Sequence, residues 1–245
     1  MRALLSNPRN RRKHNAFLAE GVRLVEEGIR ESCPLQFILF SDELSKRGKT
    51  LLENLPSGIC SFQVEPHLLK ELSNTETTQG ILAVFSLKPR PLPQNPDLLL
   101  IADGIRDPGN LGTILRTAEA AGVQGVLLTR GTTDAYAPKV VRAGMGAHFR
   151  LPIHALDWES PPEALSSLAV FNAEMHGDLP YWQADLRKPC AILIGGEAQG
   201  VSRHGQKFAH QSVQIPMPGK SESLNAAVSA AILLFEVVRQ RSTRE

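Results

Sequence analysis

The sequence predicts an α/β protein of two domains, and three observations support this prediction. Apolar runs of strand length alternate with segments of helical spacing, which is typical of a sheet covered by helices. The segment 86–97 (SLKPRPLPQNPD) carries four prolines and cannot sustain a helix or a central strand. The run Leu98–Ala102 is continuously apolar, as expected of a buried strand in a parallel sheet. We therefore expect domains at 1–88 and 98–245, joined by a linker at 89–97.

The N-terminal domain is expected to form a small α/β sandwich. Apolar residues at helical spacing predict a helix over 14–30, and further helices are predicted near 42–55 and 66–72. Short apolar runs predict strands at 35–40, 59–64 and 81–85. Residues 1–14 hold five Lys or Arg side chains and no acidic residue, a pattern that fits either a phosphate-binding site or a solvated tail.

Composition narrows the class of protein without naming its function. Of the 245 residues, 42% are hydrophobic and 21% are charged, which is ordinary for a globular protein, and the net charge of +2 does not by itself identify a nucleic-acid partner. Three scattered cysteines without a CxxC pair fit a reducing compartment and give no zinc signal. Because we find neither a signal-peptide core nor an apolar span of about 20 residues, we expect a soluble, cytoplasmic protein without a membrane segment. The cysteine pattern leads us to expect no metal.

The C-terminal domain begins with a predicted βαβ unit. The strand 98–102 is followed by a helix whose apolar face runs from Leu111 to Ala121, and then by a strand at 126–128. Further strands are predicted at 149–153, 169–172, 191–194 and 213–215. The last helix, about 223–241, is apolar nearly all round, so it must be covered by its own sheet or by another subunit.

The first segment with candidate chemistry leaves a strand at Asp103 and enters a helix near Asn110. Ligands of open α/β sheets bind in such crevices, and a helix N-terminus favours anions. An ordinary strand-to-helix turn, with Asn110 as N-cap, explains the start of this segment. It does not explain Arg116, which lies on an otherwise apolar helix and is either a salt-bridged surface residue or a phosphate ligand.

Two later segments also follow predicted strands. The second opens into a glycine-rich loop, residues 195–200, whose glycines allow a ligand to approach the backbone, although a tight turn with an exposed Glu197 fits as well. The third leads from the strand 213–215 to the last helix, with Ser221 or Ser223 as a natural cap. Capping leaves Asn225 unexplained, because Asn is a poor interior helix residue unless it hydrogen-bonds locally or to a ligand.

The order and spacing of the three segments resemble the three motifs of SpoU-type RNA methyltransferases. The matching runs are NxGxIxRTA in the first segment, GGEAQG in the second and IPMPGKSESLNAAVSAAILLFEVVRQ in the third. This resemblance covers residues 98–245. In the N-terminal half, RKHNAFLAEG and TTQGILAVFS look like the substrate-binding domain of the family. The sequence departs from many members at Gly196, where Asn is common, and at Gly144, where Ser is common.

The resemblance implies a parallel-sheet domain with a deep trefoil knot near its C-terminus, a homodimer, and S-adenosylmethionine as cofactor. In the family the cofactor is held largely by backbone groups of the second and third motifs. The corresponding cofactor-binding positions here are Gly195, Gly196, Gly200, Ile215, Met217 and Leu224.

The resemblance also implies methylation of a ribose 2′-hydroxyl in RNA, with Arg116 as the catalytic arginine. A guanidinium stays charged, so we expect Arg116 to grip an RNA phosphate and to stabilise developing alkoxide charge. Asn110 and Glu197 are expected to orient that arginine and the ribose. Ser223 and Asn225 complete the catalytic site. The N-terminal RNA contacts are expected from Arg9, Arg11, Arg12 and Lys13.

Ribosomal RNA is the favoured substrate, because the minimal transfer-RNA enzymes of this family often lack an N-terminal domain. A transfer-RNA ribose methyltransferase and an antibiotic-resistance methyltransferase of the same build remain alternatives. A catalytically silent RNA-binding relative is disfavoured, since all five candidate catalytic residues are retained together. A nicotinamide-dependent oxidoreductase does not fit, because no GxGxxG run follows a strand. The sequence does not name the methylated nucleotide.

Overall fold

The computed structural model describes residues 1–73, 78–88, 90–197 and 199–242. The described chain divides into two compact units. The first contains residues 1–88 and 134–150, and the second contains residues 90–133 and 151–242. The expectation of one continuous domain over 98–245 therefore does not hold for residues 134–150. In the predicted linker, Pro89 lies outside the described residues, and Leu92 packs against a core cluster of the second unit.

The first unit is a four-stranded sheet with helices. Its elements are α1 (Arg2–Ser6), α2 (Pro8–Lys13), β1 (Ala16–Glu20), α3 (Val22–Arg30), β2 (Leu35–Phe40), α4 (Lys46–Glu53), β3 (Cys60–Gln63), α5 (Pro66–Leu72), β4 (Ile81–Ser86), α7 (Pro138–Ala143) and a 3₁₀ turn η1 (Ala147–Phe149). The strand order is β1-β4-β2-β3, with β4 antiparallel to both neighbours and β3 parallel to β2.

The predicted helix over 14–30 is wrong in its first half. Residues Ala16–Glu20 form β1 instead, paired with β4 along its whole length. Alternate residues of β1 enter different clusters, Phe17 on one side of the sheet and Leu18 on the other. A strand that is buried on both faces has no polar alternation, so its pattern merges with that of the following helix. Gly21, with φ of 98°, ends the strand and precedes α3.

Residues 134–150 join the first unit because their apolar side chains complete its core. Val141 and Phe149 are buried in the same cluster as Phe17 and Phe85. The rings of Phe85 and Phe149 lie 4.9 Å apart. The predicted strand at 149–153 is wrong at its start, because Phe149 lies in η1 and the strand begins only at Ile153. The predicted strand begins too early because Phe149, an apolar residue buried in the core of the first unit, resembles a strand residue in sequence.

The second unit is built on a seven-stranded sheet in the order β7-β6-β5-β10-β8-β11-β9, in which every pair is parallel. Its elements are β5 (Leu98–Asp103), α6 (Pro108–Ala120), β6 (Gly125–Thr129), β7 (Ile153–Leu156), η2 (Glu163–Leu165), β8 (Ala169–Ala173), β9 (Leu179–Pro180), η3 (Tyr181–Gln183), β10 (Cys190–Gly195), α8 (Arg203–Phe208), β11 (Gln211–Gln214) and α9 (Ala226–Ser242). The predicted α/β class with a parallel sheet is confirmed. The trefoil knot stays a prediction.

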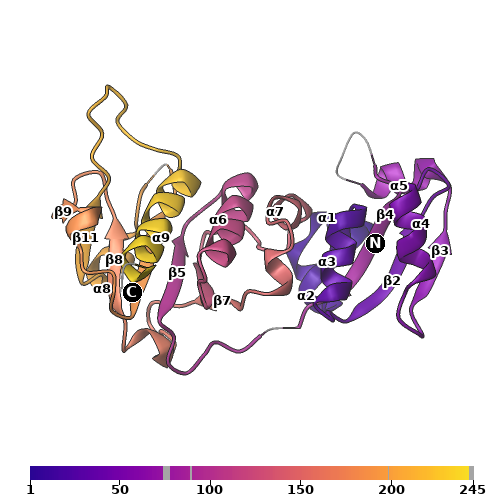
Figure 1. The fold of residues 1–245 in the computed structure, drawn as a ribbon, viewed down its shortest axis with the longest axis horizontal. Coiled ribbons are helices and arrows are strands. Elements are labelled where there is room, and N and C mark those ends of the chain that lie inside the picture. Colours follow the sequence, from indigo (N-terminus) through magenta and orange to yellow (C-terminus); the bar gives the residue numbers. More distant parts are fainter. Residues whose placement is uncertain (74–77, 89, 198, 243–245) are drawn as a thin grey trace. The chain divides into compact units, whose positions relative to one another are not determined.

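Helices α6 and α9 pack against each other, and α9 also contacts β10 (Figure 1). The central strands β5 and β10 are buried almost throughout, which explains their continuous apolar sequences. Because all seven strands are parallel, their carboxyl ends meet at one edge, where the loops of the three motifs begin. No helix in the described part of the chain is long and apolar enough to cross a membrane.

Candidate active site

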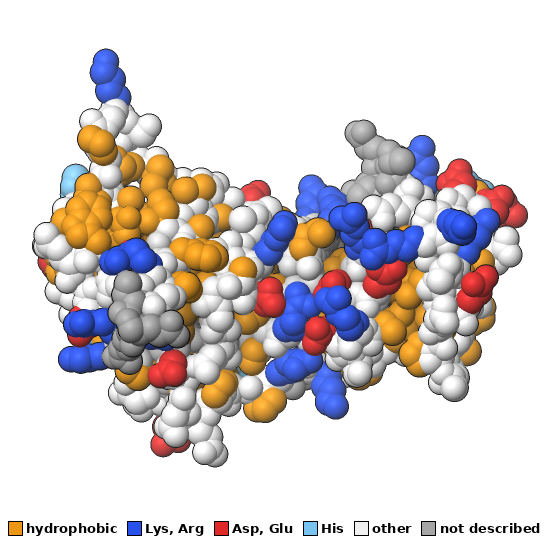
Figure 2. Space-filling model, in the orientation of Figure 1, with side chains coloured by type: hydrophobic (Ala, Val, Ile, Leu, Met, Phe, Trp, Pro, Cys, Tyr) orange, Lys and Arg blue, Asp and Glu red, His pale blue; other side chains and the backbone are white. Residues whose placement is uncertain are grey.

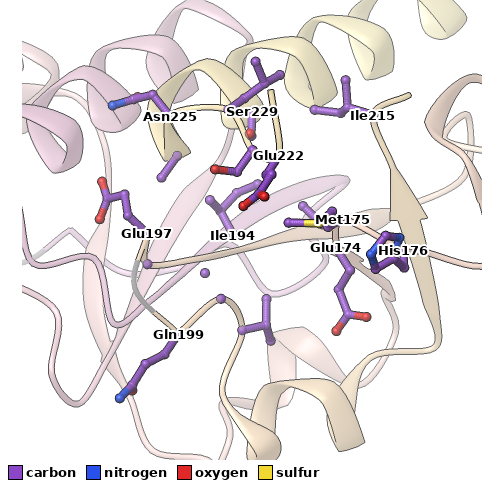
Figure 3. Close-up of a pocket in the computed structure, with 18 of the residues that line it drawn as sticks. Glu174, Met175, His176, Ile194, Glu197, Gln199, Ile215, Glu222, Asn225 and Ser229 are labelled. Carbon is purple, nitrogen blue, oxygen red and sulfur yellow. The ribbon is translucent and has the colours of Figure 1, made fainter. Parts of the chain in front are cut away.

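A cavity of about 630 Å³ lies at the carboxyl ends of β8, β10 and β11 (Figure 3). It is bounded by the glycine-rich loop after β10, by the loop between β11 and α9, and by the first turn of α9. The lining includes every position expected to bind the cofactor: Gly195, Gly196, Gly200, Ile215, Met217 and Leu224. Backbone and apolar side chains thus provide much of its surface.

Close backbone packing explains the glycines of the second motif. A Cβ atom on Gly195 would lie 2.1 Å from the carbonyl carbon of Gly200, and one on Gly196 would lie 2.4 Å from the carbonyl oxygen of Gly104. The amide of Gly196 also donates to the carbonyl oxygen of Asp103 at 3.0 Å. In this chain the loop is therefore folded tightly against the end of β5, and an Asn at position 196 would require a different backbone position.

The carboxylate of Asp103, only 4% exposed, ties this region together. One oxygen accepts from the Thr129 hydroxyl at 2.6 Å, and the other accepts from the Ser202 amide at 2.7 Å. Ser202 in turn caps α8 by accepting from the amide of Gly205. The end of β5 is thereby joined both to β6 and to the segment that follows the glycine-rich loop.

The three motifs meet in a chain of side-chain hydrogen bonds. Helix α6 is capped by Asp107, which accepts from the amide of Asn110 at 2.7 Å and so leaves the side chain of Asn110 free for other contacts. That side chain donates to the carboxylate of Glu197 and accepts from Nδ2 of Asn225 at 2.9 Å. Asn225 also caps α9, because its Oδ1 accepts from the amide of Ala227 at 2.9 Å. The cap expected at Ser221 or Ser223 is thus supplied by Asn225.

Arg116 stands apart from this cluster. It follows Asn110 by six residues on α6, which is roughly 9 Å along the helix axis, and it does not line the cavity. Its side chain is exposed, and the described residues offer it no hydrogen bond or ion pair. Of the five expected catalytic residues, three are hydrogen-bonded together, Ser223 lines the same cavity, and Arg116 lies outside it.

Comparison with known proteins decides the family. The SpoU rRNA Methylase family matches residues 97–235, and the MRM3-like substrate binding domain matches residues 1–83. This chain belongs to the SpoU rRNA methylase family. The predicted family is confirmed, and so is the predicted kinship of the N-terminal half with a substrate-binding domain.

Relatives of this SpoU methylase include proteins named as 23S rRNA 2′-O-methyltransferases and solved structures. The 23S rRNA (guanosine(2553)-2′-O)-methyltransferase RlmP of Bacillus subtilis is 33% identical, over 95% of this chain and 92% of that protein. The 23S rRNA (uridine(2479)-2′-O)-methyltransferase of Streptomyces viridochromogenes is also 33% identical, over 98% and 88%. The crystal structure of the SpoU methyltransferase AviRb from the same organism, in complex with AdoMet, superimposes with a TM-score of 0.89 at 30% identity, covering 99% of this chain and 97% of that one.

Sequence reasoning missed several residues of this SpoU methylase that line the cavity, among them Glu174, Met175 and His176 just after β8. The signal available was position, since they follow a predicted buried strand and strand ends are where parallel sheets bind ligands. Oε1 of Glu174 accepts from Nδ2 of Asn172 at 2.8 Å and from Nε2 of Gln206 at 3.0 Å. In the described residues we find no group of three side chains placed to hold a metal ion.

The N-terminal basic residues lie on two helices, α1 and α2. One of these residues, Arg11, is not available to RNA. Arg11 is 3% exposed, pairs with Asp134, and donates to the carbonyl oxygens of Leu4 and Leu5. Its expected phosphate contact is therefore corrected to a structural role, in which it fastens α2 to the segment 134–150. Arg9, Arg12 and Lys13 are exposed.

Proposed function

We propose that this chain transfers a methyl group from S-adenosylmethionine to the 2′-hydroxyl of a ribose in ribosomal RNA. The observation that carries the proposal is the meeting of the three SpoU motifs at one cavity, through the hydrogen bonds of Asn110, Glu197 and Asn225. Membership of the family and the named activities of full-length relatives support the same reaction and favour ribosomal over transfer RNA.

The cavity fits the proposed cofactor. Its volume of about 630 Å³ lies within the usual range for small-molecule sites, roughly 300–1,000 Å³. Ile215, Met217 and Leu224 offer apolar surface for an adenine ring, and the backbone at Gly195 offers polar groups for its edge. When bound, S-adenosylmethionine supplies an electrophilic methyl group on a good leaving group, so the protein must chiefly align the ribose and help to remove its proton.

The polar cluster is suited to this alignment. Glu197 and Asn225 line the cavity, and the side chain of Asn110, at the start of α6, is hydrogen-bonded to both. A cluster whose orientation is fixed by hydrogen bonds can position a ribose hydroxyl without first reorganising. Ser223 presents a hydroxyl group on the same wall. We assign to Arg116 the binding of the RNA phosphate next to the target ribose, which fits its exposed position outside the cavity.

We further propose that the chain acts as a homodimer through α9. Hydrophobic side chains gather over this helix (Figure 2). Val228 and Phe235 are 47% and 49% exposed, and their spacing of seven residues places them on the same side of the helix. Trp182, in the adjacent η3, is 49% exposed. An apolar stripe of this kind marks an interaction surface, and a second copy of the chain is the occupant that accounts for it.

RNA selection is assigned to the first unit, with phosphate contacts from Arg9, Arg12 and Lys13. Removing one phosphate contact should flatten the dependence of log K on log salt by about 0.7–0.9. Replacing all three residues by Ala should therefore reduce the slope by roughly 2–2.7 in filter-binding titrations. Arg187→Ala, which removes an exposed arginine paired with Asp185, serves as the control and should leave the slope unchanged. Equal slopes for the triple variant and wild type would exclude these contacts.

The reaction itself is tested by nucleoside mass spectrometry of RNA treated with the protein and cofactor. We expect a 2′-O-methyl nucleoside, and a methylated base with an unmodified ribose would contradict the proposal. Arg116→Ala should abolish turnover but leave calorimetric affinity for S-adenosylmethionine unchanged. Arg116→Lys should also be severely impaired, because an ammonium cannot make the planar two-pronged contact. A wild-type protein that binds RNA but gains no thermal stability from the cofactor would instead support a silent RNA-binding relative.

A further inference from the structure

The charge of the cavity is one-sided. Its lining contains three carboxylates, Glu174, Glu197 and Glu222, and no Lys or Arg among the described residues. Figure 3 shows the three glutamates on different elements around the space: after β8, after β10 and in the loop before α9. No ion pair in the described part of the chain neutralises any of them. A cleft lined by one sign of charge concentrates ligands of the opposite sign.

Glu174 is held in place without being neutralised. Both of its donors, Nδ2 of Asn172 and Nε2 of Gln206, are uncharged amides, and both meet the same oxygen, Oε1. Asn172 is only 3% exposed, which fixes this contact at the end of β8. A glutamine at position 174 could keep both hydrogen bonds through its own Oε1. Glu174→Gln therefore removes the charge and keeps the geometry.

Glu222 lines the cavity from a different segment, the loop between β11 and α9. Within the described residues it makes no hydrogen bond and no ion pair. A carboxylate that lines a ligand cavity and has no partner to neutralise it contributes to the field inside that cavity, although Glu222 is exposed and solvent screens its charge. Unlike Glu197, neither Glu222 nor Glu174 belongs to the hydrogen-bonded cluster assigned to the ribose.

Methyl transfer changes the charge of the ligand in this field. The S–CH₃ bond breaks with its electron pair left on sulfur, a bond forms between the methyl carbon and the ribose oxygen, and the hydroxyl proton is released. The cofactor has a net charge of +1 from its sulfonium, whereas the product, S-adenosylhomocysteine, has a net charge of zero. Resting on the proposed function, we propose that Glu174 and Glu222 make the cavity selective for the cationic cofactor over its neutral product.

This selectivity gives the site a way to release its product. The attraction that favours binding of the cofactor vanishes once the methyl group has left, so the product is held only by contacts common to both ligands. At a separation of roughly 5–8 Å between a carboxylate and the sulfonium, one carboxylate, screened by solvent and salt, contributes about fivefold to tenfold to the affinity for a cation. Glu174 and Glu222 therefore distinguish the two ligands by their charge and not by their shape.

Calorimetric titration of the full chain with three ligands tests the inference. S-adenosylmethionine and sinefungin are cationic, the latter because a protonated amine stands near the position of the sulfonium, and S-adenosylhomocysteine is neutral overall. We expect Glu174→Gln and Glu222→Gln each to weaken binding of the two cations about fivefold to tenfold and that of the neutral product less than twofold. Glu163→Gln, at an exposed carboxylate that does not line the cavity, should change none of the three.

Ionic strength provides a second measurement. Raising the salt concentration should weaken binding of the cations to wild type and leave the neutral product unaffected, and this difference should shrink in the double variant. Equal weakening of all three ligands in the variants, or no change in any, would overturn the inference while leaving the proposed function in place. A wild-type protein that binds none of the three ligands would overturn the proposed function as well.

Discussion

Replacing Asn225 by Asp separates the two roles that the structure gives this residue. Oδ1 caps α9 by accepting from the amides of Ala227 and Val228, while Nδ2 donates to Asn110 at 2.9 Å. Aspartate keeps a capping oxygen but places an acceptor where the donor was. Alanine removes both. The pair of variants therefore distinguishes a residue that only starts a helix from one that also aligns the active site.

The expected magnitudes follow from these hydrogen bonds. Removing the cap costs about 1 kcal/mol of stability, and removing an exposed side-chain hydrogen bond adds about 0.5 kcal/mol, so Asn225→Ala should lower the free energy of unfolding by roughly 1.5 kcal/mol. Asn225→Asp should stay within about 0.5 kcal/mol of wild type, since a carboxylate at a helix N-terminus is favourable. Neither variant can donate to Asn110, and we expect at least a tenfold loss of kcat/KM in each, equivalent to about 1.4 kcal/mol of transition-state stabilisation.

Urea unfolding measures the first quantity, and methyl transfer to ribosomal RNA measures the second. The account requires Asn225→Asp to be stable and impaired. An Asn225→Asp protein with wild-type kcat/KM, next to an inactive and destabilised Asn225→Ala protein, would show that Asn225 acts only as a cap and that the hydrogen bond between the first and third motifs has no catalytic importance.

Three further predictions concern stability and assembly. Arg11→Ala should lower the free energy of unfolding by roughly 3 kcal/mol. This is the low end for a broken buried ion pair, because the side chain of Asp134 is 28% exposed. Arg9→Ala should have no such effect, and equal urea midpoints for the two variants would refute the structural role of Arg11. Burial lowers the pKa of His148 from 6.5 to about 4. Below pH 6.5 the unfolded chain therefore gains a proton that the folded chain does not, and the free energy of unfolding should fall by up to about 3 kcal/mol as the pH approaches 4. His148→Gln should remove this part of the pH dependence, and an unaltered profile would show that His148 is not its source. Phe235→Asp should convert the proposed dimer into a monomer in sedimentation experiments, whereas Glu163→Gln should not, and a dimer that survives would place the interface elsewhere.

The sequence predicts the second unit better than the first, for a physical reason. The central strands of a parallel sheet are covered on both faces, so β5 and β10 are uninterrupted apolar runs that are easy to find. In the first unit β1 is equally buried, but it stands between two helical segments, and its apolar residues extend the helical pattern of the segment that follows. Phe149 belongs to a core most of whose residues lie more than 60 positions away, and no local pattern shows such contacts.

The candidate site shows the same division between local and long-range information. Positions on the second and third motifs follow from the family resemblance, and the structure brings them to one cavity. The caps of the two helices are not the residues that local sequence suggests: Asp107 rather than Asn110 caps α6, and Asn225 rather than a serine caps α9. Contacts between side chains that are distant in sequence decide which polar residues remain free to take part in the reaction. The spacing of residues along the chain does not reveal these contacts.

The burial of Arg11 illustrates the limit for charged residues. Five basic side chains among fourteen positions look alike in sequence, yet one of them is enclosed and paired with Asp134, 123 positions later. Arginine is the cation best suited to a buried pair, because its fork of donors can satisfy a carboxylate and several carbonyl groups at once. Only the tertiary structure separates this residue from the exposed cations on either side of it.

The central claim is tested most directly by mapping ribose 2′-O-methylation across the ribosomal RNA of cells that lack this gene. We predict that one 2′-O-methylated position, or a small set of them, disappears from ribosomal RNA, is restored by the wild-type gene, and is not restored by the Arg116→Ala variant. An unchanged ribosomal methylation map, together with a 2′-O-methyl group missing from transfer RNA, would contradict the proposed substrate. Maps that are unchanged in both RNAs would contradict the proposed activity.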